Sequence, residues 1–254
     1  MRHLLLSRWE GSIFAACLGL DCSLIWQQGI ESLAAKGDWK PPLRKESSGE
    51  ILLVSLPRLL FFCDQPEAAI TQPHQLAQSQ LAITSYTKVM AAIFTEQLVR
   101  EKLFQDLEVA LWQEDNYEIL QTLQISLEQG KSLQEVKEQL PQSCWEIWLA
   151  LYCFVSSAED IVLTVNRADQ LGGAEVTALV GALSGAHNGV SAIPIPWRCR
   201  YREQLKRWKA KLEAMFITWS GSYEFARMGQ PMDINQLGAI ALPGVIQARH
   251  SIQK

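Results

Sequence analysis

Residues 171–196 read LGGAEVTALVGALSGAHNGVSAIPIP, and this stretch decides the fold. Between the pair Gly172-Gly173 and Pro194, nearly every residue is compatible with a helix. Small residues recur at every fourth position, in one row of Ala174, Ala178, Ala182 and Ala186 and an adjacent row of Gly181, Gly185 and Gly189. Residues four apart share a helix face, and each glycine inside a helix costs about 1 kcal/mol relative to alanine. We therefore expect a central helix whose small face packs against another backbone.

A second segment offers a matching surface. Residues 8–20, RWEGSIFAACLGL, predict a helix that carries its own row of small residues, Gly11, Ala15 and Gly19. Two helix backbones approach closely only where the side chains between them are small. We therefore expect this helix to be the partner of the 174–189 helix.

These segments also resemble a known family. In the ADP-ribosylglycohydrolase family, a Gly-Gly-Asp-x-Asp-Thr motif opens a small-residue helix that ends in Gly-Ala-x-x-Gly and is followed by Ile-Pro. The matching residues here are Gly172-Gly173-Ala174-Glu175-Val176-Thr177, Gly185-Ala186-His187-Asn188-Gly189 and Ile193-Pro194. Residues 11–21 resemble the family's N-terminal run of glycines before an aspartate, and residues 47–50 stand near the place of its Thr-Asp-Asp-Thr motif. The resemblance implies a single compact all-α domain.

The resemblance also implies a pair of magnesium ions, which require oxygen ligands. The two family aspartates fall on Ala174 and Val176, whose side chains supply no oxygen, and only Thr177 of that motif is kept. Glu175 lies about 100° around a helix from either neighbour and cannot replace both. We therefore expect no catalytic residue, no metal ligand and no cofactor, with Mg²⁺ needed only if the site has been rebuilt.

Two sets of candidate residues remain. For substrate or ligand binding they are Gly172, Gly173, Glu175, Thr177 and His187. For a rebuilt metal site they are Asp21, Glu50 and Thr177, with Glu175 beside them. Structural roles account for most of these residues: Asp21 for capping a helix, Glu50 for a capping box with Ser47, and His187 as a satisfied or half-exposed histidine.

The remaining chain predicts further helices and no strand of note. Apolar spacing indicates helices over residues 26–35, from 50 with a break at Pro57, 74–103 (one or two helices), 103–112, 117–129, 132–140, from 143, 158–170 and 196–219. Ser132 with Glu135 and Ser143 with Glu146 predict capping boxes. Ser156 or Ser157 is expected to cap the 158–170 helix, with Glu159 and Asp160 in its first turn.

Composition bounds the class of protein. The 254 residues carry a net charge of −4 without a basic block, so we expect no nucleic-acid partner. Arg100 is expected to be a solvated surface charge, as is the basic face of residues 196–219, which could otherwise dock an acidic partner or a membrane surface. No apolar run reaches the roughly 20 residues of a membrane span. The six cysteines form no Cys-x-x-Cys pair, and a cytoplasmic protein with buried thiols is expected.

We expect one domain over residues 1–219, with a loop at 36–49, and a partly extended or disordered tail at 220–254. Three functions are consistent with these residues. The first is a non-catalytic ADP-ribosylglycohydrolase-like protein that binds a protein partner or an ADP-ribose-like ligand. The second is an active metal-dependent hydrolase of ADP-ribosyl bonds with a rebuilt site. The third is an unrelated all-α interaction protein.

Overall fold

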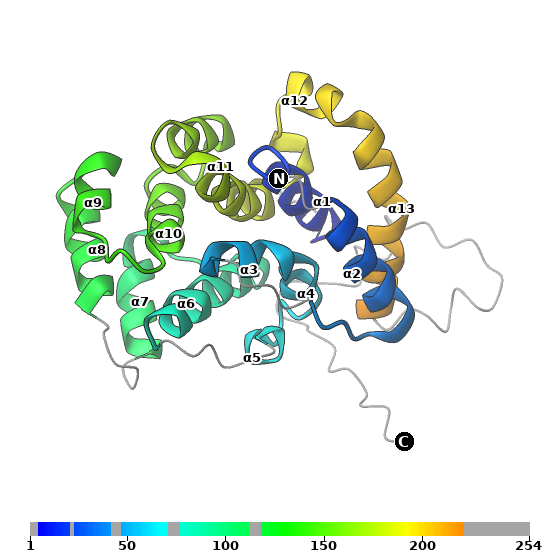
Figure 1. The fold of residues 1–254 in the computed structure, drawn as a ribbon, viewed down its shortest axis with the longest axis horizontal. Coiled ribbons are helices and arrows are strands. Elements are labelled where there is room, and N and C mark those ends of the chain that lie inside the picture. The colour runs from blue at the N-terminus through cyan, green and yellow to red at the C-terminus, as the bar shows by residue number, and fades with distance from the viewer. Residues whose placement is uncertain (1–4, 21–22, 42–46, 71–76, 112–117, 221–254) are drawn as a thin grey trace.

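The computed structural model describes residues 5–20, 23–41, 47–70, 77–111 and 118–220. Within these ranges the chain forms thirteen α-helices and two short 3-10 helices, with no strand, which confirms the all-α prediction (Figure 1). The helices are α1 (Leu5–Ala16), α2 (Ser23–Lys36), α3 (Ser48–Val54), α4 (Leu56–Phe61), α5 (Pro66–Ala69), α6 (Ala77–Phe94), η1 (Arg100–Lys102), α7 (Leu103–Ala110), α8 (Glu118–Glu128), α9 (Leu133–Gln139), α10 (Trp145–Ser157), α11 (Ile161–Asn188), η2 (Val190–Ala192), α12 (Ile195–Arg200) and α13 (Arg202–Trp219).

The close contact between α1 and α11 is the centre of the fold. A Cβ atom added to Gly11 would overlap the Gly185 carbonyl oxygen, and one added to Gly185 would overlap the Gly11 carbonyl oxygen. Gly181 lies in the same way against the Ala15 carbonyl, and Gly19 against the backbone at Ala174 and Ala178. The two predicted rows of small residues therefore meet backbone to backbone, as the sequence indicates.

Helix α11 consists of two helices joined at a kink. Gly173 has φ 70° and ψ −168°, a conformation that only glycine adopts without strain. The expected break between the 158–170 and 174–189 segments is therefore present at Gly173. Only this residue has a non-helical backbone, and the helix resumes directly after it. At the same place, a Cβ atom on Gly172 would overlap the Val176 side chain, so both glycines of the pair are required by the geometry.

The other helices build a core around this pair. Helix α10 packs on α11 and is buried over residues 147–155. Helix α6 is tied to α11 by the Tyr86 hydroxyl, which donates to the Leu179 carbonyl oxygen at 2.8 Å. Helices α2 and α13 pack together at one end of the long axis, and α8 and α9 lie at the other (Figure 1). At the end formed by α2 and α13, Trp9 of α1 makes edge-to-face ring contacts with Phe216 and Trp219 of α13.

The expected loop at 36–49 follows the end of α2 at Lys36 and precedes α3, whose first residue is Ser48. Its described part is held by the buried Arg58, which donates to the Asp38 carboxylate at 2.9 Å and to the Trp39 carbonyl oxygen at 2.7 Å. Arg58 follows Pro57, and the chain breaks there into α3 and α4 as predicted.

Two predicted caps are confirmed and two are wrong. Ser47 with Glu50 and Ser132 with Glu135 form complete capping boxes. The box expected at Ser143 does not form, because the cap of α10 is Cys144, which has a left-handed conformation with φ 62° and makes no side-chain capping bond. Ser156 and Ser157 belong to the end of α10 instead of capping the next helix.

The helix that follows α10 is capped by Asp160. Its carboxylate accepts hydrogen bonds at 3.0 Å from the amides of Val162 and Leu163. Asp160 is therefore a cap and not a first-turn acid, because α10 runs to Ser157 and α11 begins only at Ile161. The predicted 74–103 segment ends earlier, at Phe94, and Glu96 follows with φ 58°.

The predicted basic helix at 196–219 is divided into α12 and α13 at Tyr201.

Across the described residues, no helix combines the length and the apolar character that crossing a bilayer requires. Among the described cysteines, Cys17, Cys63, Cys144 and Cys153 are buried as expected, whereas Cys199 is exposed, contrary to the expectation of buried thiols. The expected tail beyond residue 220 and the candidate ligand Asp21 lie outside the described residues.

Candidate functional site

Three segments that resemble the family motifs converge beside the kink of α11. Gly19, which follows α1, lies against Ala174 and Ala178, and Gly49 at the start of α3 lies against the Glu175 carboxylate. We call this place, made by residues 19, 47–50 and 172–178, the kink junction. Sequence resemblance predicts that the motifs correspond to one site, and the fold brings them together from three separate helices.

The oxygen atoms of the kink junction bond to one another. The Ser47 hydroxyl donates to the Glu175 carboxylate at 2.5 Å and accepts from the Glu50 amide at 3.1 Å. The Glu50 carboxylate in turn accepts from the Ser47 amide at 3.4 Å. Thr177 is 2% exposed, and its hydroxyl donates to the Gly173 carbonyl oxygen at 2.8 Å. These bonds hold α3 against α11 and stabilise the kink.

Among the groups of the kink junction, the Glu175 carboxylate has a shifted pKa. Burial raises its pKa, and the neighbouring Glu146 and Glu50 carboxylates raise it further. The Ser47 hydroxyl opposes this shift, because its hydrogen bond favours the charged form. Glu175 therefore takes up a proton more readily than an exposed glutamate does.

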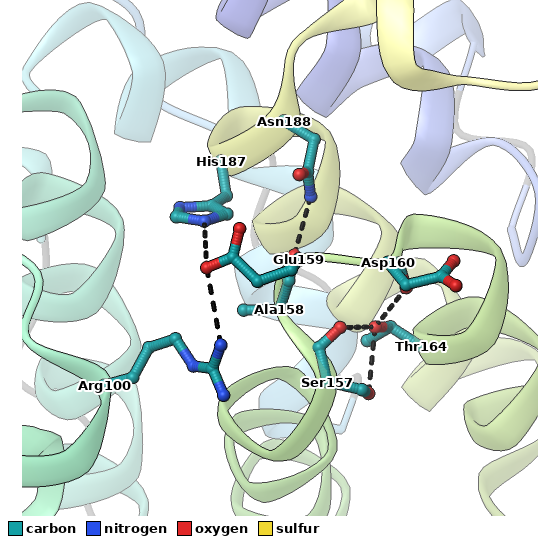
Figure 2. Close-up of polar contacts among 8 residues, drawn as sticks. All are labelled: Arg100, Ser157, Ala158, Glu159, Asp160, Thr164, His187 and Asn188. Atoms are coloured by element: carbon teal, nitrogen blue, oxygen red, sulfur yellow. Dashed lines mark hydrogen bonds and ion pairs between the residues drawn. The ribbon is translucent and has the colours of Figure 1, made fainter.

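His187 lies at the other end of the helix, roughly 15 Å from Thr177 at 1.5 Å per residue. Its Nε2 atom is 3.7 Å from the Glu159 carboxylate, which is also 3.4 Å from the Arg100 guanidinium. Figure 2 shows Glu159 between the two side chains, and the neighbouring Asn188 amide donates to the Ala158 carbonyl oxygen at 2.8 Å. Glu159 is therefore an ion-pair partner in the turn between α10 and α11, and the first-turn position predicted for it is wrong because α11 begins at Ile161.

Burial lowers the pKa of His187, and the Glu159 carboxylate partly offsets that effect. Its ring also meets Phe154 edge-on, with the ring centroids 5.8 Å apart. The structure therefore gives His187 a half-buried packing environment. It does not bring His187 together with Gly172, Gly173, Glu175 and Thr177, which all lie at the kink junction.

Comparison with models of known protein families shows which family the chain belongs to. The family model described as ADP-ribosylglycohydrolase matches residues 14–222. The chain belongs to the ADP-ribosylglycohydrolase family. Searches of curated proteins and of solved structures found no match. The match begins within α1 and extends beyond the end of α13, so it includes all three segments of the kink junction.

At the kink junction of this ADP-ribosylglycohydrolase family member, the two positions that the resemblance matches to aspartates carry side chains without oxygen. Ala174 is exposed but offers a methyl group, and Val176 is 0% exposed and packs on Gly172. The nearby oxygens of Ser47, Glu50 and Thr177 are engaged in the bonds described above. Over the described ranges, no group of three or more His, Cys, Asp or Glu side chains could hold a metal ion.

A pocket elsewhere in the family member was not indicated by the sequence. It encloses about 430 Å³ between η1, α8, α10 and the first half of α11. Arg100, Lys131 and Arg167 line it, so Arg100 is a pocket residue and not only the solvated charge expected from the sequence. No sequence signal could have found this group, because its members come from separate elements without a shared motif.

Proposed function

We propose that this ADP-ribosylglycohydrolase family member is a non-catalytic protein that acts by binding. Its partner in this proposal is an ADP-ribose-like ligand or a protein. The observation that carries the proposal is the pair Ala174 and Val176, which stand where the resemblance implies aspartate ligands. Neither side chain has an oxygen atom, and the buried Val176 presents only methyl groups where a cation would need oxygen ligands.

Hydrolysis of a glycosidic bond needs an activated water molecule or a pair of positioned carboxyl groups. Glu175 accepts the hydrogen bond from the Ser47 hydroxyl that holds α3 against α11, and the Glu50 carboxylate closes the capping box at the start of α3. A carboxylate that supports the packing of two helices is poorly placed to exchange protons with a substrate. This arrangement supports a binding role over bond cleavage.

One observation favours the alternative of an active hydrolase with a rebuilt site. Glu175 has a raised pKa and lies near Glu50 and Glu146, and a carboxyl group of this kind suits general acid chemistry. Because Asp21 lies outside the described residues, the site of this alternative rests on Glu50, Glu175 and Thr177. It predicts release of free ADP-ribose, which the binding proposal does not.

The decisive experiment compares binding with turnover in the same sample. Wild-type protein is titrated with Mg²⁺ and with Mn²⁺ while thermal melting is followed, because a specifically bound ion raises the melting temperature in a saturable way. ADP-ribose is then titrated by calorimetry, and release of ADP-ribose from a modified arginine or serine peptide is measured. Saturable ADP-ribose binding without a metal-dependent shift and without turnover supports the proposal. Metal-dependent release of ADP-ribose establishes the active alternative.

We further propose that the functional domain spans residues 1–219 and that residues 220–254 form a separate tail that meets a protein partner. The apolar composition of residues 234–246 supports this division. A cytoplasmic location is part of this proposal, because the six cysteines form no Cys-x-x-Cys pair and disulfide-dense frameworks are typical of small exported domains. A chain ending at residue 219 should melt within about 2 °C of the full chain, since a 1 kcal/mol change in a domain of this size shifts melting by only a few degrees.

A further inference from the structure

The 430 Å³ pocket between η1, α8, α10 and α11 has the size of a small-molecule site. Its wall combines the apolar side chains of Leu127 and Val155 with the cationic side chains of Arg100, Lys131 and Arg167. We call it the cationic pocket. It shares no residue with the kink junction, so its chemistry is independent of the lost magnesium ligands.

The three cations of the pocket are poorly neutralised. The Arg167 guanidinium donates to the Ser156 hydroxyl at 3.0 Å, and the Lys131 ammonium donates to the Gln139 amide oxygen at 3.2 Å; both partners are neutral. Among the described residues neither cation forms an ion pair, and Arg100 has one, at 3.4 Å, with Glu159. Surface cations usually find carboxylates or water, but three that line one concave pocket create a local positive potential.

Two carboxylates also line the pocket, and they are exposed. These are Glu101 and Glu128, of which Glu128 accepts a hydrogen bond from the Gln124 amide at 2.8 Å. Their exposure lets water screen their charge, whereas the half-buried guanidinium of Arg167 is screened less. The positive charge therefore prevails inside the pocket.

Two buried polar atoms on the wall lack a hydrogen-bond partner in the described part of the chain: the Arg100 Nε atom and the Gln124 amide oxygen. Gln124 is only 7% exposed. A buried polar atom without a partner costs about 1–3 kcal/mol. The two residues that carry these atoms, Arg100 and Gln124, both line the pocket, so its wall has polar groups whose hydrogen-bonding capacity is not used within the protein.

The wall that carries Lys131 is held rigidly before any ligand arrives. Gly130 ends α8 with φ 63°, and the Lys131 amide donates to the Ser126 carbonyl oxygen at 3.0 Å. The Tyr152 hydroxyl from α10 donates to the Lys131 carbonyl oxygen at 2.7 Å. A pre-formed wall lowers the entropy lost on binding.

We propose that the cationic pocket binds a small phosphorylated molecule. Two guanidinium groups offer fork-shaped donor pairs for phosphate oxygens, and the Lys131 ammonium supplies a third positive charge. A phosphomonoester carries about −1.5 to −2 charges at neutral pH, which suits this excess better than a singly charged carboxylate does. Leu127 and Val155 provide an apolar surface for the rest of the ligand.

The test is calorimetric titration of the full chain with inorganic phosphate at pH 8, at constant ionic strength, with acetate as the carboxylate probe. Wild-type protein should bind phosphate saturably and acetate at least about tenfold more weakly. Arg167→Gln should weaken phosphate binding roughly tenfold or more, since a charge-assisted hydrogen bond is removed. The matched control is Arg202→Gln, an exposed cation of α13 outside the pocket, which should leave phosphate binding within about twofold of wild type.

Lys131→Gln provides a second route to the same answer if Arg167→Gln loses its fold, which circular dichroism and thermal melting will report. The proposal is overturned if phosphate shows no saturable binding, if acetate binds as well as phosphate, or if the Arg202→Gln control weakens binding as much as the pocket variants do. None of these outcomes depends on ADP-ribose or magnesium, so the result is separate from the test of the proposed function.

Discussion

The kink junction and the cationic pocket differ in how their polar side chains are paired. At the kink junction, Ser47, Glu50 and Glu175 bond to one another across two helices. In the cationic pocket, the hydrogen bonds of Arg167 and Lys131 go to the neutral side chains of Ser156 and Gln139. Polar atoms that satisfy one another stabilise a fold, whereas charges that lack a counter-ion favour a ligand. The place that the family resemblance marks as a metal site thus has the chemistry of a structural joint.

The strongest way to break this comparison is to separate the helices that form the joint. Gly185→Val places a branched side chain against the Gly11 carbonyl oxygen, where only backbone fits. We expect a loss of at least about 3 kcal/mol in the free energy of unfolding, because α1 cannot move away without opening the core. Urea unfolding measures it. Ala210→Val, at an exposed position of α13, should cost only about 0.5 kcal/mol. Equal effects of the two changes would contradict the backbone contact.

Restoring the aspartates at the junction is the next largest change. Val176→Asp buries a carboxylate that has no partner at a position 0% exposed, and we expect a loss of about 3 kcal/mol in the unfolding free energy. The double variant Ala174→Asp/Val176→Asp should be equally unstable without metal. If Mg²⁺ then raises its melting temperature above that of wild type, the junction retains the geometry of a metal site and the comparison fails.

The bond between α3 and α11 can be isolated with two matched serines. Ser47→Ala removes an N-cap and the hydrogen bond to Glu175 on another helix, and we expect a loss of about 2 kcal/mol. Ser132→Ala removes an N-cap whose hydroxyl bonds only within its own capping box, and it should cost about 1 kcal/mol. The difference between the two losses in unfolding free energy, measured by urea unfolding, reports the contribution of the hydrogen bond between Ser47 and Glu175. Equal losses would show that Glu175 contributes nothing through Ser47.

The smallest expected effect is a pH dependence with opposite signs at the two ends of the 174–188 helix. The pKa of Glu175 is raised above its ordinary value of 4.5, so its contribution to stability is complete below pH 4.5 and is lost as the pH rises through its folded pKa. The pKa of His187 is lowered from 6.5, so its contribution is complete above pH 6.5 and is lost as the pH falls.

Thermal melting between pH 4 and pH 8 tests both signs. Glu175→Gln should remove the loss of stability that wild type shows as the pH rises above 4.5. His187→Gln should remove the loss of stability that wild type shows as the pH falls below 6.5. The charged groups that act on the His187 ring are Glu159, Arg8 and Arg100. Identical pH profiles for wild type and both variants would show that neither group couples to folding.

Local residue chemistry predicted much of this fold correctly. The small rows, the break at Gly172-Gly173, the helix break at Pro57 and two capping boxes depend on residues close together in the sequence, which is why a pattern reveals them. The cap at Ser143 failed because Cys144 takes a left-handed conformation that no local pattern indicates. The role of Glu159 was incomplete for the same reason, since Arg100 and His187 reach it from elements far away in the chain.

By itself, the sequence determined that this protein is an all-α member of its family and that Ala174 and Val176 offer no side-chain oxygen, because side-chain identity fixes which atoms exist. Only the tertiary structure decided that Glu175 is held by Ser47, that His187 lies far from it, and that three cations from separate elements share one pocket. Distances between remote residues are set by how helices pack, and packing is a property of the whole core.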